Sequence, residues 1–215
     1  MLKELLNGYI EGSIKKNWDI EALSNYREKG FTYRDIAGRI MKFHLFFRKA
    51  GIAEGDKVAL VGRNSANWCM IYLATVSYGA VIVPVLPDFK PDDLMNIINH
   101  SDSKLLLVDD KIWETLDAAR IPRVMTVISA DTFDLLLSRD PGAEKAYREL
   151  DREYSQLYPD LKPEDVKFPD IPNDSLAVIS YTSGTTGFSK GFMLTHNSLA
   201  ANVRFAQNNM PLNPG

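Results

Sequence analysis

Four short, uninterrupted apolar runs constrain the fold of this 215-residue chain more than any other feature of its sequence. The runs cover residues 58–61, 81–85, 105–108 and 124–128, and segments with helical periodicity separate them. Strands that are buried on both faces form continuous apolar runs, whereas strands with one solvated face alternate. The succession of strands and helices therefore predicts an α/β fold, with a mainly parallel sheet and helices on both of its faces.

The helical segments carry recognisable start and stop signals. Thr32 is suited to cap a helix that extends to about residue 50, with Asp35 in its first turn and Gly51 at its end. Pro91 suits the first turn of a helix that ends near His100. Further helices are expected at residues 65–78, 112–120, 143–157 and 195–209, and a further strand is expected at residues 176–179.

A run of 24 residues without a formal charge lies between Arg63 and Asp88. It is long enough to cross a bilayer, because a membrane-spanning helix needs about 20 apolar residues. However, Gly79 interrupts the run, and residues 81–85 are β-branched and include a proline. A buried helix followed by a buried strand is therefore favoured over a transmembrane span.

Charge and cysteine content narrow the class of protein. The formal net charge is only −3, which gives no basis for binding nucleic acid. Cys69 is the single cysteine, and its apolar surroundings predict a buried, inert thiol. The first residues lack the apolar core of a signal peptide. We therefore expect a cytoplasmic protein, with peripheral contact to a membrane left open.

A proline-containing connector divides the chain. Residues 131–174 hold 12 acidic and 6 basic residues, a net charge of −6, and are interpreted as a solvated surface segment. Within them, prolines at 159, 163, 169 and 172 resist both helix and central strand. The expected organisation is an N-terminal arm at 1–30, a first α/β subdomain with the connector at 31–170, and the start of a second subdomain at 171–215.

The segment with the clearest chemistry is residues 181–191, YTSGTTGFSKG. Its glycines allow a sharp turn, and successive backbone N–H groups in such a turn can bind an anion. Its hydroxyl groups add donors and its lysine adds a mobile positive charge. The candidate phosphate-binding residues are Thr182, Ser183, Gly184, Thr185, Thr186, Gly187 and Lys190. A flexible surface turn is the alternative, but the apolar strand before the loop favours phosphate binding.

The loop does not match the Walker A pattern. Counted from Gly184, the sixth position of that pattern is Ser189 rather than glycine. The chain also lacks the GxGxxG fingerprint, so a P-loop NTPase and a dinucleotide-binding dehydrogenase are both disfavoured.

Together with Lys190-Gly191 and His196-Asn197, this loop closely resembles the phosphate-binding signature of adenylate-forming (AMP-binding) enzymes. Upstream segments resemble the family's landmarks in the right order: FTYRD at 31–35, GDKVA at 55–59, NSANW at 64–68 and GAVIVP at 79–84. Thr185 is more typical of acyl-CoA synthetases, including long-chain fatty acid–CoA ligases, than of peptide-synthetase domains. Ser189 departs from the family's usual proline, which is expected to make the loop less rigid.

The resemblance implies an enzyme that joins ATP and a carboxylic acid, expected to be a fatty acid, into acyl-AMP and then transfers the acyl group to coenzyme A. It implies ATP, Mg2+ and coenzyme A as cofactors. The family's metal, ribose and catalytic residues would lie beyond Gly215, so no catalytic or metal-binding residue is assigned and the chain is expected to be an N-terminal part. The alternative is a non-catalytic, truncated homologue that binds a nucleotide or a partner, and a homo-oligomer is left open.

Three histidines and the tryptophans complete the candidates. His44 and His100 are expected to be structural, and for His196 a capping or packing role and a ligand contact stay open. Each tryptophan is assigned to core packing.

Overall fold

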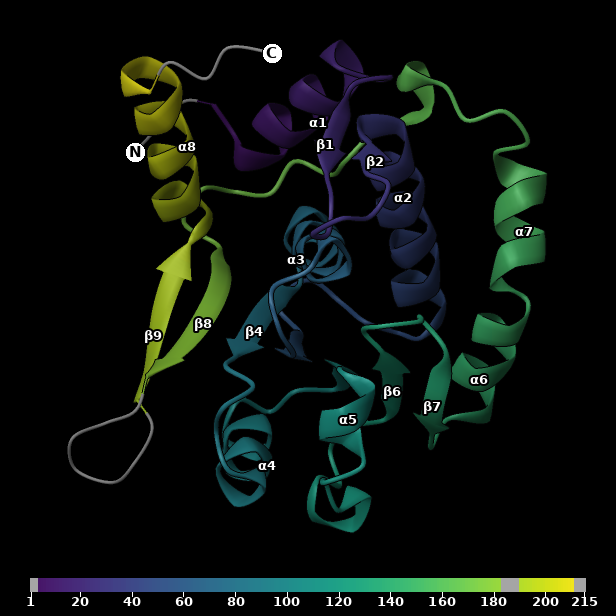
Figure 1. Ribbon diagram of the computed structural model, residues 1–215, viewed down its shortest axis with the longest axis vertical. Coiled ribbons are helices and arrows are strands. Elements are labelled where there is room, and N and C mark those ends of the chain that lie inside the picture. The colour runs from purple at the N-terminus through teal and green to yellow at the C-terminus, as the bar shows by residue number, and fades with distance from the viewer. Residues whose placement is uncertain (1–3, 183–189, 211–215) are drawn as a thin grey trace.

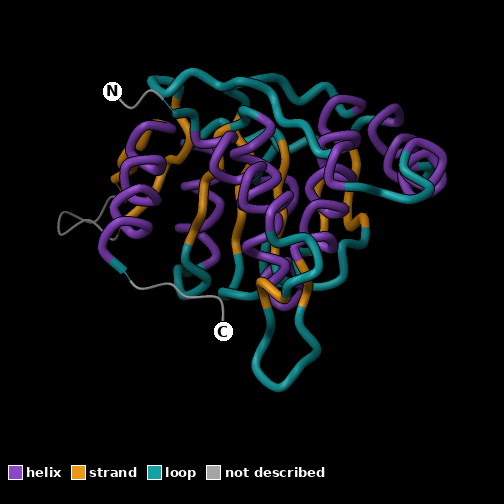
Figure 2. Tube along the Cα trace, turned by 90° about the horizontal axis from the view of Figure 1, so that it is seen from above, coloured by secondary structure: helices purple, strands orange, loops and turns teal. Residues whose placement is uncertain are grey.

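The main element of the chain is a seven-stranded sheet with helices on both sides (Figures 1 and 2). The computed structural model describes residues 4–182 and 190–210. The strand order in this sheet is β7-β6-β5-β3-β4-β8-β9. The strands are β3 (Lys57–Val61), β4 (Val81–Val85), β5 (Leu105–Val108), β6 (Thr126–Ser129), β7 (Leu135–Ser138), β8 (Leu176–Thr182) and β9 (Lys190–Thr195).

The centre of the sheet is parallel. Strand β3 pairs in parallel with β4 and β5, β6 extends the sheet beside β5, and β8 extends it beside β4. The edge strands β7 and β9 run antiparallel to their neighbours. The prediction of one mainly parallel sheet is therefore confirmed. All four apolar runs form parallel strands, and these lie next to one another in the order β6-β5-β3-β4.

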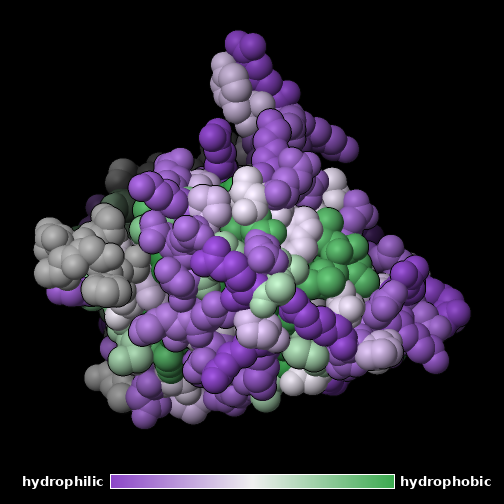
Figure 3. Space-filling view, turned by 90° about the horizontal axis from the view of Figure 1, so that it is seen from below, coloured by the Kyte–Doolittle hydropathy of each residue, from purple (hydrophilic) through white to green (hydrophobic). Residues whose placement is uncertain are grey.

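Alternate residues of each strand face opposite helical layers. Val58 and Leu60 pack into a core with α1 (Leu6–Lys16), α2 (Tyr33–Lys49) and α3 (Ala66–Tyr78). Ala59 and Val61 pack into the opposite core, with α4 (Pro91–His100) and Ile112 and Trp113 of α5 (Asp110–Trp113). Figure 1 shows α1–α3 above the strands and α4 and α5 below them. The face that carries α4 and α5 is mostly hydrophilic (Figure 3).

Local signals fix the ends of these helices. Thr32 and Asp35 form a reciprocal capping box at the start of α2. The Ser65 side chain accepts a hydrogen bond from Trp68 N at the start of α3. Gly79 ends α3 in the left-handed conformation, with φ of 94°, and a side chain there would also strike Ile171.

Several boundaries differ from the sequence prediction. Instead of one helix at 112–120 there are the short α5 and a 3-10 turn, Ala118–Arg120, because the Asp117 side chain caps a new turn. The charged helix expected at 143–157 is two helices, α6 (Pro141–Arg148) and α7 (Leu150–Leu157). The strand expected at 176–179 is β8, and it is longer than predicted, since β9 pairs with it as far as Thr182. The final helix, α8, spans His196–Asn209.

Residues near the N-terminus contribute to the core. Leu6 and Ile14 of α1 are buried, and Asn7 donates hydrogen bonds to the carbonyl oxygens of Ser77 and Pro169. After α1, β1 (Glu21–Leu23) and β2 (Phe31–Thr32) form a separate antiparallel ribbon whose loop projects from the molecule (Figure 2). The division into subdomains stays a prediction, and β8 pairs directly with β4.

The uncharged run forms α3 and β4, as predicted. Among the described residues, no helix has the length and apolar character needed to span a membrane. Cys69 on α3 is half-buried rather than fully buried, and burial raises the pKa of its thiol.

Candidate functional site

A groove lies at the carboxyl ends of β3, β4 and β8. Its volume is about 630 Å³. In open α/β sheets, ligands bind outside the carboxyl ends of the strands, and this groove has that position. It is lined by Gly62, Arg63, Asn64, Trp68, Pro84, Val85, Leu86, Pro87, Asp88, Ser180, Tyr181 and Thr182.

The pairing between β4 and β8 leaves space for this groove. The two strands share one registered pair, Ile82 with Val178, whereas β3 and β4 are registered along their whole length. Pro84 follows two residues later and has no backbone N–H to donate across the sheet. Parallel pairing therefore stops short of the carboxyl end, where Pro84 and Tyr181 line the groove.

The β8–β9 hairpin places the two ends of the glycine-rich loop side by side. Thr182 is the last residue of β8, Lys190 is the first residue of β9, and they are cross-strand partners. Both side chains are exposed. The other predicted phosphate ligands lie outside the described residues: Ser183, Gly184, Thr185, Thr186 and Gly187.

The loop end of this hairpin is anchored by Tyr181, which is buried. Its hydroxyl lies 2.7 Å from Nδ1 of His100 at the end of α4, and the two rings meet edge to face. Burial raises the pKa of the Tyr181 hydroxyl, so it stays protonated at neutral pH. Opposite it, Gly191 lies so close that an added Cβ would be 3.0 Å from Ile179 Cγ2 and 3.2 Å from Tyr181 Cζ. These contacts position the strand that leads into the loop.

The wall opposite the hairpin is the start of α3. Trp68 is half-buried, stacks on Tyr72 with the ring centroids 5.4 Å apart, and also lines the groove. Its assignment to core packing alone was therefore incomplete. Asn67 donates hydrogen bonds to the carbonyl oxygens of Ala130 and Asp131, which fixes this end of α3 against β6.

The charges near the groove leave Lys190 available to an anion. Within residues 4–182 and 190–210, no carboxylate lies within salt-bridge distance of Lys190. The same residues include no group of three or more His, Cys, Asp or Glu that could hold a metal ion.

The histidines are placed as follows. His44 is buried inside the α1–α3 layer, and His100 supports Tyr181 from the surface. His196 is fully buried at the start of α8, does not line the groove, and its ring nitrogens have no hydrogen-bond partner among the described residues. Burial lowers the pKa of His196, which favours the neutral ring. Sequence reasoning gave no signal for the contact between His100 and Tyr181, because 81 residues separate them.

Three curated proteins that are similar to this chain are named as CoA ligases. A putative acyl–CoA ligase, YdaB, of Bacillus subtilis is 29% identical over 94% of this chain and 37% of its own length. A long-chain-fatty-acid–CoA ligase of Thermus thermophilus is 28% identical over 78% of this chain and 28% of its own length. A 4-hydroxybutyrate–CoA ligase of Metallosphaera sedula is 27% identical over 87% of this chain and 34% of its own length. The chain thus spans about a third of the length of these relatives.

Solved structures show the same fold. A crystal structure of an anthranilate CoA ligase with anthranoyl-AMP superposes with a TM-score of 0.76 at 16% identity, over 97% of this chain and 37% of that one. A long-chain-fatty-acid-CoA ligase from Archaeoglobus fulgidus gives a TM-score of 0.72 at 22% identity, over 95% and 39%. The family model for AMP-binding enzymes matches residues 10–214. The chain therefore belongs to the family of AMP-binding, adenylate-forming enzymes.

Proposed function

We propose that this chain supplies the ATP-phosphate-binding part of an AMP-forming carboxylate–CoA ligase. The observation that carries the proposal is the β8–β9 hairpin, which holds Thr182 and Lys190 as partners beside the groove. The segment between them contributes the hydroxyl groups and glycines of the phosphate-binding sequence. Relatives named as acyl–CoA ligases support the reaction class.

In the proposed reaction, a carboxylate oxygen attacks the α-phosphorus of ATP. The bond from that phosphorus to the pyrophosphate oxygen breaks, so acyl-AMP and pyrophosphate form. The thiolate of coenzyme A then attacks the acyl carbon, and AMP leaves with the electron pair of the acyl–oxygen bond. Negative charge grows on the departing pyrophosphate, and the proposed role of Lys190 and the donors of residues 182–187 is to stabilise that charge.

The cofactors of the complete reaction are ATP, Mg2+ and coenzyme A. The cation at Lys190 and the donors of the loop fit the phosphates of ATP. The described residues offer no metal-binding cluster, so we assign Mg2+ to none of them. We also assign none of them to coenzyme A, because neither the groove nor the hairpin identifies its binding surface.

We propose a fatty acid as the substrate. Relatives named as long-chain-fatty-acid–CoA ligases support this choice. The groove also has an apolar side, formed by Trp68, Pro84, Val85 and Leu86, which suits an acid with a hydrocarbon chain. A cytoplasmic location is part of the proposal, since ATP and coenzyme A are available there.

Binding of pyrophosphate to the purified chain tests the phosphate site. Isothermal titration calorimetry should show binding that Lys190→Ala weakens roughly tenfold, because one charged contact is lost. Lys145→Ala is the matched control, since Lys145 is exposed on α6, which is not part of the groove. Equal affinity of the wild-type and Lys190→Ala proteins would remove Lys190 from the site.

A further inference from the structure

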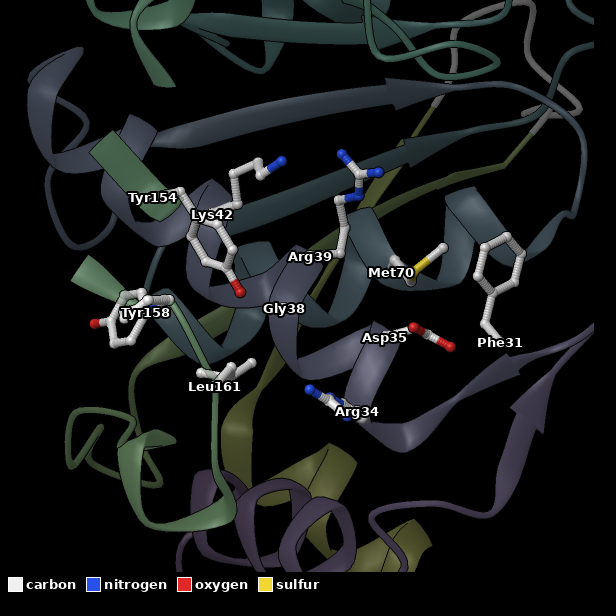
Figure 4. A pocket seen from close by; sticks show the side chains of 11 residues that line it. Phe31, Arg34, Asp35, Gly38, Arg39, Lys42, Met70, Tyr154, Tyr158 and Leu161 are labelled. Atoms are coloured by element: carbon white, nitrogen blue, oxygen red, sulfur yellow. The ribbon is translucent and has the colours of Figure 1, made fainter. Parts of the chain in front are cut away.

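A second pocket lies between α2, α7 and the connector that follows α7 (Figure 4). Its volume is about 390 Å³, and it shares no lining residue with the groove at the carboxyl ends of the strands. Nothing in the proposed ligase reaction uses this pocket. One side of it presents cationic groups from α2, and the other side presents the rings of Tyr154 and Tyr158.

Three cations of α2 line this pocket, and one of them, Arg34, lies 3.6 Å from Asp160 Oδ1. Arg39 is the first of the other two. It is half-buried, and its guanidinium carbon lies 4.0 Å from the centroid of the Phe133 ring. In the described part of the chain, no carboxylate lies within salt-bridge distance of this guanidinium. Burial lowers the pKa of Arg39, which is the usual consequence of removing a cation from water. A partly desolvated cation without a paired anion is costly, and a bound anion would offset that cost.

Lys42 is the second cation, one helical turn after Arg39. Figure 4 shows the two charged heads on the same side of α2. The Lys42 ammonium lies 2.6 Å from Asp151 Oδ1 and 5.2 Å from the centre of the Tyr154 ring. The Asp151 side chain is 85% exposed, so it can turn into solvent at little cost when another anion approaches.

The carboxylate of Asp35 also lines the pocket, but it is already engaged. Its Oδ2 accepts hydrogen bonds from the backbone N and the hydroxyl of Thr32, at 2.8 Å each, in the capping box of α2. Figure 4 shows this carboxylate directed toward Phe31, away from the heads of Arg39 and Lys42. Asp35 therefore does not pair with Arg39 or Lys42.

The pocket has room for an apolar body beside these cations. Gly38 stands between them and the tyrosines, and an added Cβ there would lie 3.0 Å from Tyr154 Oη. Tyr154 and Tyr158 form a ring pair with centroids 5.4 Å apart, and Met70 and Leu161 add apolar surface. A ligand with an anionic group and an apolar body could thus place the anion against the cations of α2 and the body against the tyrosine rings.

We propose that this pocket binds a small phosphate monoester with an aromatic or other flat apolar body. Two neighbouring cations match the charge of a phosphate monoester, which is about −1.5 to −2 at neutral pH. The guanidinium of Arg39 offers the paired donors that phosphate oxygens accept, and Lys42 adds a point charge. The body of the ligand lies against the Tyr154 ring and above Gly38.

Phenyl phosphate is the probe for this site, and calorimetric titration of the purified chain is the measurement. Arg39→Gln should weaken binding roughly tenfold through loss of a charged hydrogen-bond donor. Gly38→Leu should abolish binding by filling the pocket, while it keeps both cations and adds a good helix former to α2. Asp151→Asn should strengthen binding severalfold, because it frees Lys42 from its competing anion. This gain cannot come from misfolding, and circular dichroism checks the fold of the other two variants.

The phosphate-binding loop is a separate site in the same chain, so Lys190→Ala is the distinguishing variant. Unchanged phenyl phosphate affinity in Lys190→Ala, with loss in Arg39→Gln and Gly38→Leu, supports the proposal. Weaker binding of inorganic phosphate and of benzoate than of phenyl phosphate supports the requirement for both the double charge and the flat body. Binding that is lost in Lys190→Ala and retained in Arg39→Gln would overturn the proposal and assign the probe to the loop.

Discussion

Replacement of His44 tests whether a buried neutral histidine limits the stability of this fold in mild acid. His44 is 6% exposed, and its Nε2 lies 3.0 Å from both the carbonyl oxygen of Ala74 and the hydroxyl of Ser77. The rings of Tyr78 and Phe168 meet it edge to face. Burial lowers the pKa of His44 to about 4, because a charged imidazole would lose its hydration among these groups.

The size of the effect follows from the difference between the two states. In the unfolded chain a histidine has a pKa near 6.5, so between pH 6.5 and 4 the unfolded state binds a proton that the folded state does not. Stability therefore falls as the pH falls through this window, by up to about 1.4 kcal/mol per pH unit. The total is about 3 kcal/mol, a large share of a free energy of unfolding of roughly 5–15 kcal/mol.

Urea unfolding followed by circular dichroism at pH 7 and pH 5 measures this contribution. His44→Phe keeps an aromatic ring in the cluster but has no group that titrates, so its loss of stability between these two pH values should be smaller by about 2 kcal/mol. His196 also has a pKa lowered by burial, but it is present in both proteins and cancels in the comparison. An identical loss of stability in the wild-type protein and His44→Phe would refute the reasoning.

Further predictions concern the hairpin, the loop and the surface. In the proposed ligase reaction, Lys190→Ala should raise the activation free energy of acyl-AMP formation by about 2–4 kcal/mol, measured as slower pyrophosphate release, while Lys145→Ala should not. The 215-residue chain alone should release no pyrophosphate with ATP, Mg2+, fatty acid and coenzyme A, because it spans about a third of the length of its ligase relatives and orientation of both reactants supplies roughly 7–11 kcal/mol. Gly191→Val should cost about 1–3 kcal/mol of stability in urea unfolding, since the new side chain overlaps Ile179 and Tyr181. Sedimentation velocity should show self-association that Met193→Lys reduces, because Met193 and Phe192 are exposed on the edge strand β9.

The sheet could be predicted from the sequence because a strand that is buried on both faces forms a continuous run of apolar residues. Residues 105–108 form a continuous apolar run, and β5 occupies the same residues, all buried. The edge strand β7 is harder to predict from the sequence, since its residues are only half-buried and a turn, not a helix, connects it to β6. Helix α1 was missed because Gly8, Gly12 and polar residues interrupt its apolar pattern. Its burial depends on contacts with residues far along the chain, such as the hydrogen bond from Asn7 to Pro169.

A phosphate-binding loop could be predicted from the sequence because its glycine, hydroxyl and lysine residues are contiguous, from Thr182 to Lys190, and its role stays a proposal. The supports of that loop could not be found in this way. His100 and Tyr181 belong to elements that meet only after the sheet has formed. Neither residue type indicates which residue it will contact. The same holds for Arg39 and Tyr154, which line the second pocket from helices more than 100 residues apart.

The acidic segment, residues 131–174, shows that the role of charged residues also depends on contacts between segments far apart in the sequence. Residues 131–174 suggested a solvated surface, because an excess of carboxylates in a sequence normally faces water. In the structure, Asp151, Glu153 and Asp160 pair with cations of α2, so part of the segment neutralises that helix. Arg39 lies on the same helix and has no carboxylate partner within the described ranges. The charge that distinguishes the second pocket is thus a cation of α2 that this pairing leaves without a salt bridge among the described residues, and it becomes visible only when α2 and α7 are placed side by side (Figure 1).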